Sequence, residues 1–107
     1  PNDLNLRMIE TLRRRYGAPV GYSGHERLLE PSLIAAALGA VAIERHITLD
    51  RSMYGSDQSA SLEPDEMKML VSRLGEMREW LGDGEKRVTE GEASVARKLR
   101  YWLDDAA

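Results

Sequence analysis

The spacing of apolar residues predicts four helices along the chain. In DLNLRMIETLRRRYG (3–17) the apolar side chains fall on one side of a helix that ends at Gly17. A compact helix is expected over 30–40, where Pro31 suits the first turn and Gly39 the end. A third helix opens at Pro64, and a short one follows in ASVARKLRYWLDD (93–105). The apolar residues on which the first, third and fourth predicted helices are based are, in turn, Leu6, Ile9, Leu12 and Tyr16; Met67, Leu70, Val71, Leu74, Met77, Trp80 and Leu81; and Val95, Leu99 and Trp102.

Two short strands are predicted between these helices. The first is Val20–Tyr22, after Pro19, and the second is AVAIERHITL (40–49), which is rich in β-branched residues. Because strands alternate with helices, the two should pair in parallel as neighbours through a crossover helix, and the expected fold class is α/β. The polar segment DRSMYGSDQSASLE (50–63) is long for a passive loop, which favours a functional role for it.

Polar side chains gather on one face of both predicted strands. Since side chains alternate along a strand, Ser23 and His25 share a face of the first, and so do Glu44 and His46 in the second. Neighbouring parallel strands lie about 4.8 Å apart, so His25 and His46 can reach a common point at the carboxyl ends of the strands. The opposite face, towards the helices, would hold Val20, Tyr22, Val41, Ile43 and Ile47, with Arg45 as an exception among them.

Two imidazoles with nearby oxygens can hold a divalent metal, because neutral imidazole suits Mn, Fe, Co or Zn. The carboxyl ends of parallel strands are also where α/β barrels and open α/β sheets place their sites. The alternative is structural: a histidine in a strand is most often simply hydrogen-bonded, Glu44 would pair with Arg45 or with another residue of the barrel, and Ser23 would cap a turn. Similarly, RRR (13–15) fits a solvated helix edge better than a phosphate site. Packing roles are expected for Met67, Met69, Met77, Trp80 and Trp102.

Composition narrows the class of protein. The 107 residues carry a net charge of −3, which disfavours a nucleic-acid or membrane-surface binder. Cysteine is absent, which excludes a disulfide framework, a CxxC zinc site and a thiol nucleophile. We expect no membrane span, no signal peptide and a cytoplasmic setting. Since PNDLNLRM lacks an initiator Met, the chain is expected to begin inside a longer one or after processing.

Three segments of the chain resemble the sialic acid synthase family or, more broadly, the nonulosonic acid synthases. They are VGYSGHE (20–26), ALGAVAIERHITLDRSMYGSDQSASLEPDE (37–66) and LGDGEKRV (81–88). The resemblance covers most of the chain and is most specific at Glu44–His46 and in the polar loop that follows. It implies a (β/α)8 TIM barrel, of which residues 1–107 would form the C-terminal segment, with about two parallel strands and flanking helices.

The resemblance also implies a chemistry. These enzymes condense phosphoenolpyruvate with N-acetylmannosamine or its 6-phosphate, using a divalent metal such as Mn²⁺, with Mg²⁺ and Co²⁺ as alternatives. Water attacks the enol phosphate carbon, and inorganic phosphate leaves by C–O cleavage. By resemblance, His25 and His46 are catalytic metal ligands, and Glu44 orients a water or moves a proton. Ser23 is similar to a serine that contacts the phosphate of phosphoenolpyruvate, and Asp57 to an aspartate that binds the sugar.

The length of the chain qualifies this resemblance. A whole barrel needs about 250 residues and eight strands, so we expect these 107 residues to be inactive alone. They should associate with the rest of the barrel or form a homo-oligomer, and the antifreeze-like C-terminal domain of many members is expected to be absent. One alternative is a non-catalytic metal-binding or assembly fragment. Another is a related phosphoenolpyruvate-dependent synthase of 3-deoxy sugar acids, whose motifs fit ERHITLD (44–50) less well.

Overall fold

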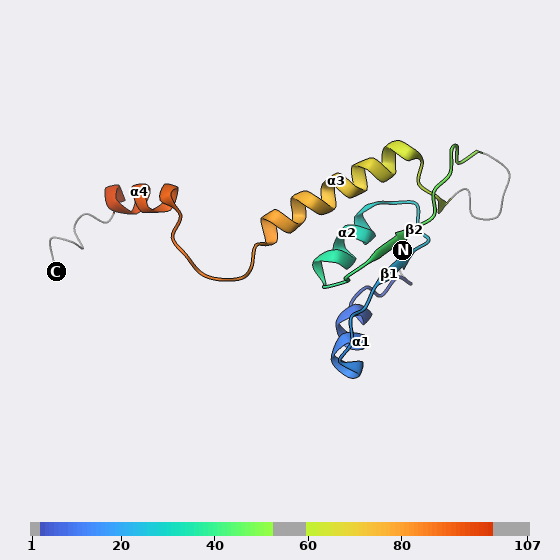
Figure 1. The fold of residues 1–107 in the computed structure, drawn as a ribbon, viewed down its shortest axis with the longest axis horizontal. Coiled ribbons are helices and arrows are strands. Elements are labelled where there is room, and N and C mark those ends of the chain that lie inside the picture. The colour runs from blue at the N-terminus through green and yellow to red at the C-terminus, as the bar shows by residue number, and fades with distance from the viewer. Residues whose placement is uncertain (1–2, 53–59, 100–107) are drawn as a thin grey trace.

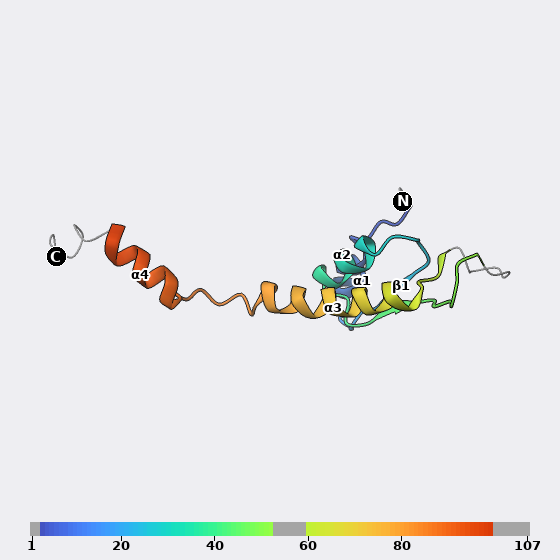
Figure 2. The same cartoon turned by 90° about the horizontal axis from the view of Figure 1, so that it is seen from above.

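The structure is a computed structural model that describes residues 3–52 and 60–99. Figure 1 shows the second helix of the chain next to the paired strands, with the third helix alongside the second and the first helix below the strands, and Figure 2 shows the last helix at the far end of the segment 82–89. Asp57 and Trp102 lie outside the described residues, so the expectations for them stay predictions. The elements are α1 (Met8–Tyr16), β1 (Tyr22–Gly24), α2 (Glu30–Ala37), β2 (Ile43–Arg45), α3 (Pro64–Leu81) and α4 (Glu90–Leu99).

The two strands pair in parallel, as predicted, and α2 forms the connection between them. Ser23 lies opposite Glu44, and Gly24 lies opposite Arg45. The first strand begins two residues later than the expected start at Val20. The backbone is already joined to the second strand at Val20, whose carbonyl accepts the Val41 N–H at 2.8 Å, but Pro19 has no N–H to donate and Gly21 has no side chain to pack.

Beyond Arg45, the backbone that continues the second strand pairs with Leu62, shortly before α3. Ile47 and Leu62 form a parallel bridge. The Leu62 N–H donates to the His46 carbonyl at 2.8 Å, and the Thr48 N–H donates to the Leu62 carbonyl at 2.9 Å. Leu62, two residues before α3, therefore lies directly beside His46.

The ends of the first and third helices follow from local backbone chemistry. Gly17 ends α1 in a left-handed conformation with φ 61°, as its position predicts. At the other end, Asn5 has a positive φ of 47°, which Asn tolerates, so α1 begins at Met8 rather than in the DLNLR stretch. The third helix begins at Pro64 as expected, behind a capping box formed by Glu63 and Glu66.

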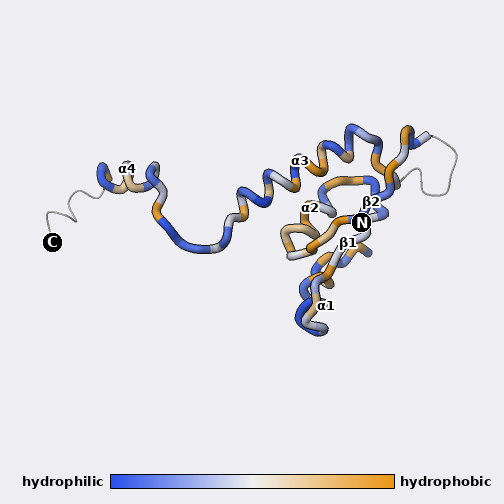
Figure 3. The backbone as a smooth tube through the Cα atoms, viewed as in Figure 1, coloured by the Kyte–Doolittle hydropathy of each residue, from blue (hydrophilic) through white to orange (hydrophobic). Residues whose placement is uncertain are grey.

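The buried core of the described residues is small. Leu62 and Ala35 are fully buried and Leu70 nearly so, and Figure 3 shows α2 as largely hydrophobic whereas blue and orange alternate along α3. Several positions predicted to pack are instead more than half exposed, because no described element covers them. They are Tyr16, Val41, Ile47, Met69, Val71, Trp80, Leu81, Val95 and Leu99. In the described part of the chain, no helix combines the length and apolar character needed to cross a membrane.

Candidate functional site

Ser23 and Glu44 face each other across the two strands. The Ser23 hydroxyl donates a hydrogen bond of 2.7 Å to Glu44 Oε1, and both side chains are exposed. The alternative in which Glu44 pairs with Arg45 is not the arrangement observed, because Arg45 forms its ion pair with Glu26. Strand pairing thus turns a carboxylate and a hydroxyl from distant parts of the sequence into one polar pair.

His25 and His46 lie side by side just beyond this pair. Their ring centroids are 5.3 Å apart and the ring planes are inclined by 49°. Each histidine directly follows the last residue of a strand, so both stand at the carboxyl ends of the sheet, and both are exposed. The structure therefore brings together the two predicted ligands, and their role as ligands stays a prediction.

The donor set suits a transition metal only in part. Two exposed imidazoles on neighbouring strands are a fitting pair of nitrogen donors for a divalent first-row ion. Within residues 3–52 and 60–99, His, Asp and Glu side chains form no group of three that could hold a metal. Water, a substrate oxygen or residues beyond the described ranges would have to complete the coordination.

Charged side chains tie together the two ends of the segment that contains Asp57. Arg51 Nη1 contacts the Glu66 carboxylate, and Arg51 Nη2 lies 3.6 Å from Glu63 Oε1. The N–H of Glu63 donates to Glu66 Oε1 at 3.0 Å, and this bond, together with Arg51, lowers the pKa of Glu66 below its ordinary value. Sequence reasoning did not identify Arg51. The spacing of Glu63 and Glu66, which is typical of a capping box, could have identified these two carboxylates as a pair, but not Arg51 as their partner.

Asp50 strengthens the first end of the same segment. Its Oδ1 accepts the Ser52 N–H at 2.8 Å and the Ser52 hydroxyl at 2.7 Å. These two hydrogen bonds, the backbone one first, hold the pKa of Asp50 below its ordinary value. Leu62, which follows the polar segment, donates its N–H to the His46 carbonyl, so Leu62 lies beside the histidine pair.

The Tyr22 side chain is hydrogen-bonded to Glu26, on the face of the first strand opposite to Ser23. Its hydroxyl donates to Glu26 Oε2 at 2.8 Å. Burial, followed by the hydrogen bond to Glu26 and the charge of that carboxylate, raises the pKa of Tyr22 to about 12. The phenol therefore stays protonated near neutral pH and is not placed to act as a base, which agrees with the expectation that Tyr22 faces the helices.

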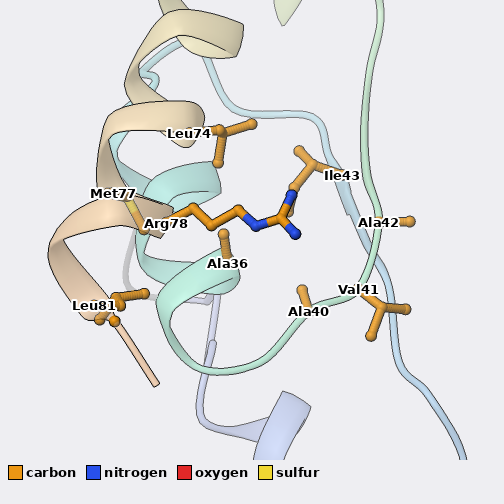
Figure 4. Close-up of a pocket in the computed structure, with 10 residues that line it drawn as sticks. Ala36, Ala40, Val41, Ala42, Ile43, Leu74, Met77, Arg78 and Leu81 are labelled. Carbon is orange, nitrogen blue, oxygen red and sulfur yellow. The ribbon is translucent and has the colours of Figure 1, made fainter. Parts of the chain in front are cut away.

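A separate cleft lies at the opposite end of the second strand. Figure 4 shows the Arg78 side chain reaching across it towards Ile43. Along the second strand, the residues that line the cleft end at Ile43, the first residue of β2, whereas His46 follows the last residue of β2. The cleft is therefore not part of the histidine site. It has a volume of 540 Å³ between α2, β2 and α3 and is lined by Ala36, Ala40, Val41, Ala42, Ile43, Leu74, Met77, Arg78, Leu81 and Gly82.

Parallel strands joined by a helix, with polar side chains at their carboxyl ends, define an α/β protein whose site lies at the edge of the sheet. A comparison of the sequence with models of known protein families identifies the family to which the chain belongs. The model of the NeuB family matches residues 1–86. The chain belongs to the NeuB family.

Relatives of the chain include synthases of sialic and related acids. It is 44% identical to the N,N'-diacetyllegionaminic acid synthase of Campylobacter jejuni over 95% of this chain and 30% of that protein. It is also 44% identical to the human N-acetylneuraminate-9-phosphate synthase, over 92% of this chain and 28% of the relative. The chain thus spans less than a third of the length of these two relatives.

A solved structure of a longer protein contains the same fold. The N-acetylneuraminic acid (sialic acid) synthetase from Leptospira borgpetersenii, solved in complex with citrate, superposes with a TM-score of 0.76 at 38% identity. The match covers 91% of this chain and 33% of the synthetase. The fold of the described residues therefore occurs in this family as one part of a longer chain.

Proposed function

We propose that this chain contributes the histidine part of the active site in a sialic acid or related nonulosonic acid synthase. The observation that carries the proposal is the 5.3 Å separation of the His25 and His46 rings, at the strand ends where α/β enzymes place catalytic groups. Membership in the NeuB family and the names of the relatives support the reaction class. The substrates would be phosphoenolpyruvate and N-acetylmannosamine or its 6-phosphate.

The reaction forms one carbon–carbon bond and replaces the carbon–oxygen bond to phosphate at C2 by one to the water oxygen, and the two protons of the water end on the former aldehyde oxygen and on phosphate. C3 of phosphoenolpyruvate adds to the aldehyde carbon of the sugar, and water adds to C2. The bond between C2 and the bridging oxygen then breaks, so that this oxygen leaves with inorganic phosphate. A divalent metal held by His25 and His46 would supply Lewis-acid polarisation of the aldehyde. Two nitrogen donors favour Mn²⁺ or Co²⁺ over Mg²⁺, which prefers oxygen ligands.

Glu44 and Ser23 take complementary roles in this proposal. The Glu44 carboxylate stands two residues before His46 on the same strand, where it can orient the attacking water or accept its proton. A serine hydroxyl has one hydrogen to donate, and in the structure Ser23 gives it to Glu44. When a phosphate group binds, Ser23 would donate to it instead, which frees the Glu44 oxygen for water. Asp57 would bind the sugar acceptor.

The proposal includes assembly with further strands. We place residues 1–107 in the C-terminal part of a (β/α)8 barrel, where the described sheet has two strands and a barrel has eight. The exposed apolar side chains on α3 and before β2, such as Val71 and Val41, support an additional packing partner. The rest of the barrel, or a second copy of the protein, would cover them.

The full-length protein that contains this chain provides the test. Phosphate release from phosphoenolpyruvate should require both Mn²⁺ and an N-acetylmannosamine-type sugar. Phosphoenolpyruvate labelled with ¹⁸O at the bridging position should yield labelled phosphate. His46→Ala should abolish metal-dependent turnover, whereas Arg14→Ala should not, because Arg14 is exposed and pairs with Glu10 within its own helix. Sugar-independent phosphate release, or phosphate without the label, would contradict the proposal.

A second experiment separates the catalytic proposal from that of a non-catalytic assembly fragment. The 107-residue chain is purified alone and then mixed with the remaining part of the full-length protein. Recovered turnover supports the catalytic role. A stable monomer that stays inert after mixing supports the alternative.

A further inference from the structure

Arg45 is a buried cation directly before one of the two paired histidines. Its side chain is 0% exposed, which is uncommon for an arginine unless its charge and N–H groups are matched. It points away from the polar face that carries Glu44 and His46, since neighbouring residues in a strand face opposite sides. The reason for a charged residue in this position lies in what its guanidinium holds.

The guanidinium of Arg45 binds the connection between β1 and α2 at several points. Nη1 donates to the Leu28 carbonyl at 3.0 Å and to the Ser32 hydroxyl at 3.1 Å. Nη2 donates to the Glu26 carbonyl, and Nη1 lies 3.6 Å from Glu26 Oε1. One planar fork therefore joins the second strand to the loop after the first strand and to the first turn of α2.

Gly24 provides the space through which Arg45 passes. The two residues are register partners in the sheet. A Cβ atom on Gly24 would lie 2.7 Å from Arg45 Cδ and 2.9 Å from Glu26 Oε1, which are distances that real Cβ contacts do not show. The absence of a side chain at Gly24 is thus a condition for the path of the arginine.

We propose that Arg45 is a positioning residue that sets where His25 lies relative to His46. His25 stands between Gly24, against which the arginine packs, and Glu26, which the guanidinium binds. His46 is the next residue after Arg45, so the same side chain constrains both imidazoles. The consequence for metal binding rests on the proposed function, whereas the geometric consequence does not.

The geometric part is tested in the full-length protein by disulfide cross-linking. The double variant His25→Cys/His46→Cys places two thiols at facing positions on neighbouring parallel strands, about 4.8 Å apart, within the Cα separation that a disulfide allows. Residues 1–107 contain no other cysteine. The rate of disulfide formation then reports how well the two positions are aligned, without any metal.

Arg45→Lys is the test variant, because lysine keeps the charge but lacks the planar fork. We expect it to slow disulfide formation about tenfold, and to weaken Mn²⁺ binding to the protein with both histidines by about tenfold, as loss of a supporting residue does at metal sites. Arg14→Lys is the matched control and should change neither. Melting temperatures confirm that the rates compare folded proteins.

The outcomes separate this proposal from the proposed function. An unchanged disulfide rate in folded Arg45→Lys overturns the positioning role and leaves a structural one. If Arg45→Lys does not fold, Ser32→Ala removes one acceptor of the guanidinium and should slow the reaction about threefold; an unchanged rate there also overturns the role. If the rate falls but the parent protein binds no Mn²⁺, positioning stands and the metal part of the proposed function fails.

Discussion

The N–H of Leu62 donates to the carbonyl oxygen of His46 at 2.8 Å, which joins the end of the polar loop to one of the paired histidines. Leu62 is also fully buried. The backbone at His46 is therefore held by a residue whose side chain belongs to the core. Packing and the candidate site are coupled at this point.

Leu62→Ala should lower the free energy of unfolding by about 2–5 kcal/mol, because it leaves a cavity at a fully buried position. Leu49→Ala is the control, since Leu49 is 80% exposed, and should change the free energy by less than about 0.5 kcal/mol. Urea denaturation of the full-length protein measures both. Equal costs for the two variants would show that Leu62 is not a core residue.

Glu44→Gln should reduce kcat about a hundredfold, as expected for the loss of a general acid–base group. Glutamine can still accept the hydrogen bond of Ser23, so the local structure is retained. Steady-state kinetics with saturating phosphoenolpyruvate and sugar provides the measurement, and Mn²⁺ affinity should fall less than in His46→Ala. Wild-type kcat in this variant would remove Glu44 from the proton-transfer role.

Asp57→Asn should weaken binding of the sugar more than binding of phosphoenolpyruvate. Loss of one charged hydrogen bond to a sugar hydroxyl corresponds to about a tenfold rise in KM. Initial rates at varied concentrations of each substrate measure the two KM values. Asp65→Asn, at an exposed position in the first turn of α3, is the control. An unchanged KM for the sugar would place Asp57 outside the acceptor site.

Because of Glu66, the free energy of unfolding should fall as the pH becomes acidic. Its pKa is lowered in the folded state by the Glu63 N–H and by Arg51, so the unfolded state binds more protons as pH falls. The stabilisation is complete above the ordinary value of 4.5 and is lost as pH falls through the lower folded-state pKa. Unfolding curves at pH values on both sides of 4.5 should differ less for Glu66→Gln than for the parent. Glu79→Gln, on the same helix and exposed, is the control; a pH dependence unchanged in Glu66→Gln would contradict this account.

The alternation of polar and apolar residues was sufficient to predict the parallel pairing and the meeting of the two histidines. Both depend on the two-residue period of a strand and on the short connection through α2, which are local properties. The exposed state of Trp80 and Met69 was not predictable in the same way. Periodicity identifies the apolar side of a helix, but not whether another element covers that side.

The roles of Arg45 and Arg51 illustrate a second limit of sequence reasoning. Each arginine binds acceptors that lie in other elements: Arg45 reaches the loop before α2, and Arg51 reaches the N-terminus of α3. Neither spacing nor composition indicates which distant carbonyl or carboxylate will meet a guanidinium. Such contacts depend on the three-dimensional path of the chain, so Arg45 could be recognised only as an exception to the apolar pattern.

The opposite orientation of Arg45 and its two neighbours sets a limit on changes in chain length. Inserting or deleting a single residue between positions 42 and 46 would exchange the two faces of the strand. The arginine would then stand on the outer face, and a carboxylate or imidazole would be pressed against α2. The segment 82–89 is exposed and outside the sheet, so it can gain or lose residues at little cost. Among natural relatives, length variation should therefore collect in that segment and be missing from the strand.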